Sequence, residues 1–165
     1  MKEVDGKRLS QREININFVK ACNNCDLKNV VNYIGHGADV NSTDPAGYSR
    51  ALMYALYQCS TDDNTGELIV KYLVESGAEI NFKHGDKGSL MTSRPYFIYH
   101  AVTNFNCSDD LVYFLIKKGG TANLEYVPTT GEQKYNSALT EIIKSRPELY
   151  KKLLKEKIVS KKNTR

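Results

Sequence analysis

A short phrase that recurs along this chain limits what the chain can fold into. The phrase reads GHGADVN at 35–41, ESGAEIN at 75–81 and, less clearly, KKGGTAN at 117–123. When the three copies are aligned, their shared glycines lie 40 and 42 residues apart, at Gly37, Gly77 and Gly119. Recurrence at such a period is typical of an array in which each unit buries its apolar face against the next unit.

Two stretches with apolar residues at helical spacing precede each copy of the phrase. The pairs are INFVKAC and LKNVVNYI, RALMYALYQC and ELIVKYLVES, PYFIYHAVTNF and DDLVYFLIKK and, near the end of the chain, SALTEIIKS and PELYKKLLKEK. A polar break separates the two members of each pair, which predicts helix, turn and helix. The glycine that follows each of the first three pairs suits the left-handed conformation that ends helices. Pro147 stands where the start of a helix tolerates proline.

These paired helices that end in G-A-D-V-N resemble the units of the ankyrin repeat family. The resemblance covers about residues 14–157, and it is clearest in ACNNCDLKNVVNYIGHGADVN at 21–41 and ALMYAL at 51–56. It implies an all-α fold, an ankyrin-repeat solenoid of about four helix-turn-helix units with hairpin or loop fingers, some of them extended. The chain departs from the family pattern in three respects. No unit has the T-P-L-H tetrapeptide, Cys25 stands where glycine is usual, and the fourth unit has no closing glycine phrase.

The repeat pattern also divides the chain into segments. We predict an N-terminal extension at 1–13, a repeat domain at 14–157 and a basic flexible tail at 158–165. The four expected units span about 14–46, 47–91, 92–131 and 132–157.

Two connections between units are longer than the pattern requires. FKHGDKGSLMTSRP at 82–95 and LEYVPTTGEQKYN at 124–136 are extended fingers, and the second unit carries about six extra residues near TDDNTG between its helices. Long loops in a compact array are usually functional or disordered, and loops on a rigid scaffold are common binding sites. The two interpretations, contact with a partner and tolerated insertion, both stay open.

The resemblance implies that the first helices and the fingers line a concave surface that holds a partner protein. Tyr54, Tyr57 and His100 give this surface the aromatic character of an interface hot spot, although the tyrosines could instead cover the stems of neighbouring loops. The residues predicted to bind the partner lie on the first helices and on the 82–95 finger. They are Lys20, Asn23, Tyr54, Tyr57, Gln58, His84, Lys87, His100, Thr103 and Asn104.

Catalytic and metal-binding patterns are weak. Cys22 and Cys25 form a C-x-x-C motif, but in the repeat alignment Cys22 points into the core and Cys25 is equivalent to Cys59 in the next unit, at a helix spacing too long for a disulfide. The HGDKGS stretch at 84–89 lacks the spacing of a phosphate-binding loop. We therefore expect no enzyme activity, no cofactor, no metal and no small-molecule substrate.

Charge suggests an alternative function. Seven of the 23 lysines and arginines lie within residues 150–165, where Glu156 is the one acidic residue. Such a segment can bind nucleic acid or an anionic surface, although a solvated helix end and a frayed tail are the usual interpretation. We therefore expect a monomeric, cytoplasmic module that binds a protein of unknown identity, with binding to nucleic acid or a membrane surface as the alternative. The sequence shows no apolar run long enough to cross a membrane and no signal peptide.

Overall fold

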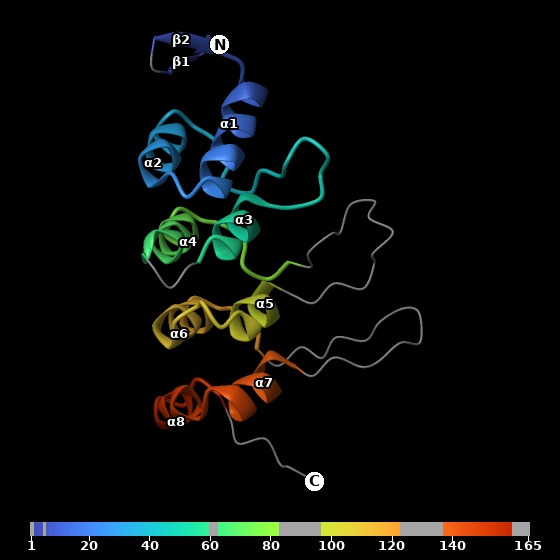
Figure 1. The fold of residues 1–165 in the computed structure, drawn as a ribbon, viewed down its shortest axis with the longest axis vertical. Helices are drawn as coiled ribbons and strands as arrows, with labels where there is room; N and C mark the ends of the chain where they lie inside the picture. Colours follow the sequence, from blue (N-terminus) through green and yellow to red (C-terminus); the bar gives the residue numbers. More distant parts are fainter. Residues whose placement is uncertain (1, 5, 60–62, 83–96, 123–136, 160–165) are drawn as a thin grey trace.

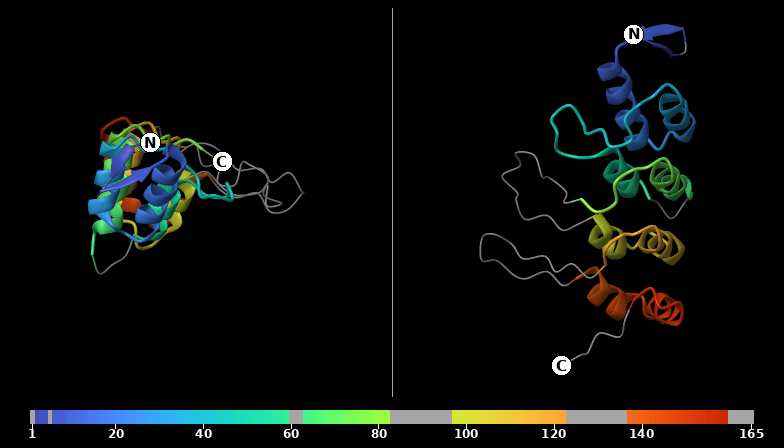
Figure 2. Two further views of the ribbon diagram at one scale, coloured as in Figure 1. Left: turned by 90° about the horizontal axis from the view of Figure 1, so that it is seen from above. Right: turned by 180° about the vertical axis from the view of Figure 1, so that it is seen from behind.

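The computed structural model describes residues 2–4, 6–59, 63–82, 97–122 and 137–159. Eight helices in these residues form four successive pairs, which are stacked in one column from the N-terminus to the C-terminus (Figure 1). The first helices of the pairs are α1 (Gln11–Asn23), α3 (Ala51–Tyr57), α5 (Phe97–Thr103) and α7 (Ala138–Ser145). The second helices are α2 (Leu27–Gly35), α4 (Thr65–Glu75), α6 (Asp109–Lys117) and α8 (Pro147–Lys155). The first helices make one row and the second helices a parallel row (Figures 1 and 2).

One hydrophobic core runs through the stack. Its largest fully buried side chains come from both rows of helices and include Phe18, Leu56, Ile98 and Leu111. The inward positions predicted from the repeat alignment are confirmed, because each is at most 1% exposed. They are Leu52, Ala55, Leu73, Ala101 and Leu115.

The chain takes a left-handed backbone conformation where second helices end. The φ angles of Gly37, Gly77 and Gly119 are 82°, 95° and 99°, which glycine adopts without steric cost. Lys157 has φ 58° just after α8, so it fills the position of the closing glycine that the fourth pair lacks. Cys25, with φ 57° in the turn between α1 and α2, likewise stands in a conformation that favours glycine.

Asparagine side chains tie each copy of the recurring phrase to its neighbour. The Asn41 Oδ1 atom accepts a hydrogen bond of 2.8 Å from the backbone N–H of Glu79, and Asn81 Oδ1 accepts one of 2.8 Å from Thr121. Asn81 also donates through Nδ2 to the carbonyl of Gly119, at 2.8 Å. These bonds fix neighbouring units in register although the T-P-L-H tetrapeptide is absent.

The N-terminal segment, predicted as an extension at 1–13, contains a β-hairpin and the start of the first helix. Strands β1 (Lys2–Val4) and β2 (Lys7–Leu9) pair in an antiparallel hairpin, which adds a small sheet to the expected all-α fold. Ser10 and Glu13 form a reciprocal capping box, so α1 begins at Gln11 and not near the predicted boundary at residue 14. Val4 is 2% exposed, so the hairpin packs on the first helix pair as part of the core.

The predicted tail at 158–165 is also corrected at its start. Ile158 donates its backbone N–H to the carbonyl of Leu153 at 3.0 Å, and Val159 is buried. These two residues therefore close the end of α8. Residues 160–165 lie outside the described residues, as do most of the two predicted extended fingers, at 83–96 and 123–136.

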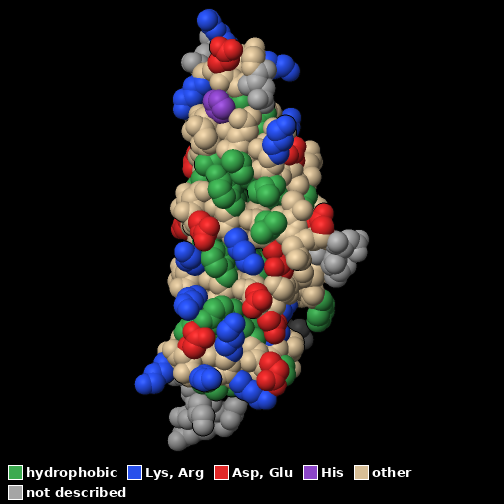
Figure 3. Space-filling view, turned by 90° about the vertical axis from the view of Figure 1, so that its left-hand side faces the viewer, with side chains coloured by type: hydrophobic (Ala, Val, Ile, Leu, Met, Phe, Trp, Pro, Cys, Tyr) green, Lys and Arg blue, Asp and Glu red, His purple; other side chains and the backbone are tan. Residues whose placement is uncertain are grey.

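The outer face of the second helices changes character along the stack. Hydrophobic side chains form their largest group above the middle of this face (Figure 3). On the helices of this part of the stack, Val31 of α2 and Leu68 of α4 are 42% and 51% exposed. Side chains of both charges cover the lower half, over α6 and α8 (Figure 3). Several of these charges are paired, among them Lys152 with Asp110 and Lys117 with Glu156.

Candidate functional site

The connection between α2 and α3 projects on the side of the first helices and forms a well-defined finger (Figure 1). We call residues 42–50 the first finger. Thr43 and Arg50 form an antiparallel bridge, and Ala51 donates its N–H to the carbonyl of Ser42 at 2.9 Å. Arg50 forms an ion pair of 2.6 Å with Glu79, and its guanidinium lies 4.5 Å from the centre of the Phe82 ring. The finger is therefore anchored at its base to the next unit.

Asp44 organises the first finger. Its Oδ1 atom accepts hydrogen bonds from the backbone N–H groups of Ala46 and Tyr48, at 2.8 and 3.2 Å. Its Oδ2 atom accepts from the N–H of Ser49 at 2.8 Å and from the hydroxyl of Tyr54 at 3.0 Å. Partial burial alone would raise the pKa of this carboxyl, but the four hydrogen bonds together lower it. Asp44 therefore stays ionised, and its acceptor positions are taken up by the finger and by Tyr54.

Three of the predicted residues meet where α1 faces the finger. Lys20, Asn23 and Tyr54 line a cavity of about 100 Å³ together with Ile16, Val19, Asp44 and Pro45. The pKa of the Tyr54 hydroxyl is raised by burial and by its hydrogen bond to Asp44, so it remains a donor across the neutral range. The prediction that these three side chains share one surface is consistent with this geometry, while their role in binding stays a prediction.

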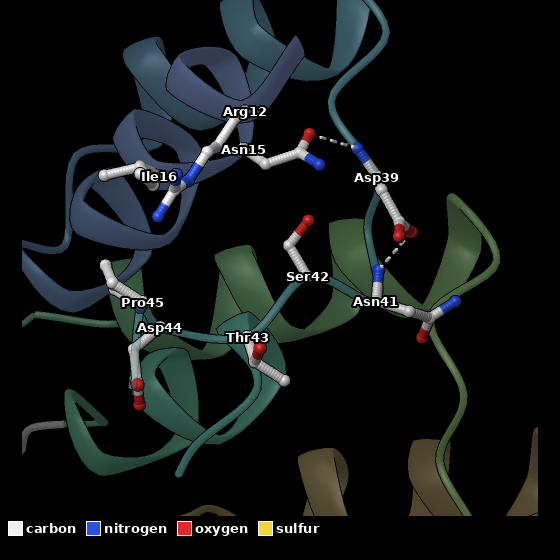
Figure 4. Close-up of a pocket in the computed structure, with 9 residues that line it drawn as sticks. All are labelled: Arg12, Asn15, Ile16, Asp39, Asn41, Ser42, Thr43, Asp44 and Pro45. Atoms are coloured by element: carbon white, nitrogen blue, oxygen red, sulfur yellow. Dashed lines mark hydrogen bonds between the residues drawn. The ribbon is translucent and has the colours of Figure 1, made fainter. Parts of the chain in front are cut away.

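A larger cavity of about 550 Å³ lies beside the first one, between the N-terminal half of α1 and the base of the finger (Figure 4). Its lining shares Ile16, Asp44 and Pro45 with the smaller cavity, so the two cavities adjoin, and we call them together the groove. The remaining lining residues are Arg12, Asn15, Asp39, Asn41, Ser42 and Thr43. The sequence prediction missed this part of the groove because it assigned Arg12 to an extension and gave no conformation for the chain at 39–45. The capping pattern S-x-x-E at 10–13 could have placed Arg12 and Asn15 on a helix.

The predicted polar residues at the ends of the first helices make contacts within the protein. Gln58 Nε2 lies 3.5 Å from Asn23 Oδ1, and Asn104 Nδ2 donates to the carbonyl of Leu56 at 3.3 Å. Thr103 donates to the carbonyl of Tyr99 in its own helix at 2.9 Å. Gln58 and Asn104 thus help to join successive units, which gives them a structural role whether or not they also contact a partner.

The predicted aromatic residues continue the surface from the second unit to the third. The rings of Tyr57 and His100 meet edge to face, with their centres 6.2 Å apart and their planes at 85°. Tyr57 is 49% exposed, so a large part of its ring is available for contact. His84 and Lys87, the two finger residues predicted to bind, lie outside the described residues.

The cysteines have the properties of core residues. All four are free thiols, and burial raises the pKa of Cys22 to about 12. A hydrogen bond with the Cys107 thiol and burial both raise the pKa of Cys59, so the thiol of Cys59 is paired with a cysteine of the third unit. The raised pKa values keep the thiols of Cys22 and Cys59 protonated and poorly nucleophilic. Among the described residues, no three His, Cys, Asp or Glu side chains cluster as a metal site, and no helix there could cross a membrane.

Comparisons with known proteins bear on the fold alone. No family model matches this chain, and no curated protein matches it. Among solved structures, the chain is similar to one chain of the complex between the predatory endopeptidase Bd0816 from Bdellovibrio bacteriovorus and the immunity protein Bd3460, with a TM-score of 0.58 and 20% identity. The match covers 84% of this chain and 62% of the other, so the chain spans less than two thirds of its length. In all, 84 solved chains match, and a shared fold does not by itself indicate a function.

Proposed function

We propose that this chain is an ankyrin-type repeat solenoid that works as a non-enzymatic binding module for a partner protein. The recurring glycine phrases, the left-handed glycines within them and the asparagine bonds between units support the family assignment. The similar solved structure is a complex of two proteins, which is in keeping with a protein-binding role for this fold but identifies no partner here.

The observation that carries the proposal is the groove between α1 and the first finger. The smaller of its two cavities brings together Lys20 and Asn23 of α1 and Tyr54 of α3, beside a first finger whose conformation is fixed by hydrogen bonds. A rigid concave surface loses little conformational freedom when a partner binds, which favours affinity. Tyr57 extends the surface along the row of first helices and supplies an exposed aromatic ring of the kind that dominates interface energies.

The alternative, binding to a polyanion through the basic C-terminal segment, has weaker support. Lys151 pairs with Glu148 at 2.7 Å, and Lys152 lies 3.8 Å from Asp110. Acidic side chains are therefore interspersed with the lysines of α8, and they reduce the positive potential that a phosphate backbone would meet. A continuous basic surface is the usual mark of a nucleic-acid binder.

Site-specific photocrosslinking tests the proposal. A photoreactive phenylalanine analogue replaces Lys20 or Tyr57 in the full chain, which is produced in its native cells and irradiated. The matched control carries the same group at Glu75, an exposed position on α4 in the other row of helices. We expect a discrete protein adduct from positions 20 and 57 and none from position 75.

Two further treatments separate the proposed function from its alternative. The adducts should survive nuclease treatment and persist when the salt is raised to about 0.5 M, because contacts made through aromatic and apolar groups are weakly screened. Equal adducts from position 75, or adducts that disappear with nuclease, would refute binding of a protein through the first-helix surface.

A further inference from the structure

The groove contains a regular row of side chains along α1. Arg12, Ile16 and Lys20 are spaced by four residues each, so they lie on one face of the helix at intervals of about 6 Å. All three line the groove: Arg12 lines the larger cavity, Lys20 lines the smaller one, and Ile16 lines both. The row therefore has a positive charge at each end and an apolar side chain in the middle.

The two positive charges of this row are available to a ligand. Neither Arg12 nor Lys20 forms an ion pair with another described residue, and both side chains are exposed. The acidic side chains of the groove, in contrast, have partners within the protein. Asp44 accepts its four hydrogen bonds from the finger and Tyr54, and it points away from Arg12 (Figure 4). Asp39 Oδ1 accepts from the N–H of Asn41 at 2.9 Å, and its carboxylate is turned toward that residue (Figure 4).

The floor of the groove contains a buried hydroxyl group without a partner. Ser42 is 8% exposed, and its Oγ atom makes no hydrogen bond within the described residues. Its side chain points toward Asn15, into the space between α1 and the chain that carries Asp39 (Figure 4). A buried hydroxyl group that lacks a partner destabilises the protein, and a polar group of a ligand at this place would remove that cost.

From these observations we propose that the groove binds an extended segment of the partner in which two acidic residues flank an apolar one, in the pattern acidic-x-apolar-x-acidic. Side chains two residues apart in an extended chain lie on the same face at a spacing of about 6.7 Å, close to the interval of about 6 Å along α1. The outer carboxylates then face Arg12 and Lys20, and the central apolar side chain packs on Ile16 and Pro45. This inference rests on the proposed function and specifies the chemistry of the partner.

A peptide titration of the full chain tests the inference. The probe is Ac-Glu-Thr-Leu-Thr-Glu-amide, whose blocked ends ensure that side chains supply the carboxylates, and the readout is the backbone amide spectrum of the nitrogen-15-labelled protein. We expect saturable shifts at Arg12, Ser42 and Tyr54. The analogue with Gln in place of both Glu residues should bind about fivefold to tenfold more weakly, the loss expected for two partly exposed ion pairs.

Variants of the protein test whether the preference for the acidic peptide arises in the groove. The double variant Arg12→Gln with Lys20→Gln should bind both peptides with the same, weaker affinity. The matched control removes two positive charges from the other row of helices, by Lys28→Gln with Lys71→Gln, and should keep the full preference. The Ser42→Ala variant should weaken peptide binding without lowering the stability of the free protein, because the hydroxyl group has no partner to lose.

Three results would overturn the inference, and each leaves the proposed function to be judged by its own crosslinking experiment. If the Gln analogue binds as tightly at the same residues, the groove is a peptide site without an acidic preference. If inorganic phosphate at equal ionic strength shifts the same signals as strongly, the groove is a general anion site. If no probe shifts these signals, the acidic segment does not bind in the groove.

Discussion

Replacing Glu67 tests how the second and third units are joined. This α4 side chain is 6% exposed, and it bridges to the start of α6. Glu67 Oε1 accepts from the backbone N–H of Ser108 at 2.6 Å, and Oε2 accepts from its hydroxyl at 2.7 Å. The same hydroxyl accepts from the N–H of Leu111 at 3.1 Å, so Ser108 is also the N-cap of α6. A carboxylate at this place is favoured by the partial positive charge at the N-terminus of a helix.

The expected loss of stability can be estimated from the two hydrogen bonds that Glu67 accepts. Hydrogen bonds to a charged group contribute about 1.5–3 kcal/mol each to stability, so their complete loss sets an upper limit of roughly 6 kcal/mol. Ser108 is exposed, and water can therefore replace part of what it loses. We expect Glu67→Ala to lower the free energy of unfolding by about 2–4 kcal/mol and Glu67→Gln, which keeps the shape and one acceptor, by about 1–2 kcal/mol.

Urea denaturation followed by circular dichroism at neutral pH measures both changes. Glu75→Ala is the matched control, since it removes an exposed glutamate from the same helix and should change stability by less than about 0.5 kcal/mol. The reasoning would be refuted if Glu67→Ala were no more destabilising than Glu75→Ala, because the buried bridge would then contribute nothing to the junction.

Three other predictions follow from the packing and the pKa shifts. Leu73→Ala should lower the free energy of unfolding by about 2–5 kcal/mol in urea denaturation, because Leu73 is fully buried, and a change near zero would contradict its place in the core. Because folding lowers the pKa of Asp44, its ionised carboxylate stabilises the fold at pH values above the ordinary pKa of 3.8. This stabilisation is lost as the pH falls through the lowered pKa of the folded state. Melting temperatures from pH 7 to pH 2.5 should therefore fall less for Asp44→Asn than for the unmodified protein, and equal slopes would count against this. Iodoacetamide at pH 8 should label the half-buried Cys25 before Cys22, whose pKa is about 12, and mass spectrometry that finds the reverse order would disprove the burial argument.

The arrangement of helices could be predicted because the same pattern occurs several times. Each pair of helices shows its apolar stripes at the same place relative to a glycine, so the inward positions Leu52 and Ala101 follow from alignment alone. Positions without glycine were harder to interpret. Cys25 and Lys157 adopt left-handed φ angles, which their residue types rarely take, and only the alignment of Cys25 with a usual glycine hints at this conformation.

The candidate site could be predicted in part. Tyr54 and Lys20 were placed on one surface because residues at equal offsets in successive first helices share a face. The larger cavity depends instead on the exact start of α1 and on the conformation of the first finger. The bonds from Asp44 to the finger's own backbone set that conformation, and spacing within the repeat carries no information about such contacts.

The asparagine bonds between units have a consequence for how a chain of this kind can lengthen. The Asn41 side chain accepts a hydrogen bond from the backbone N–H of Glu79 in the next phrase, and the Asn81 side chain accepts one from Thr121 in the phrase after that. Tandem duplication of residues 41–80 would place a new asparagine opposite a new N–H group, so every acceptor would again find a donor. Genetic duplication of one unit could thus produce a longer, correctly joined protein in a single event, with no compensating mutation at the junctions.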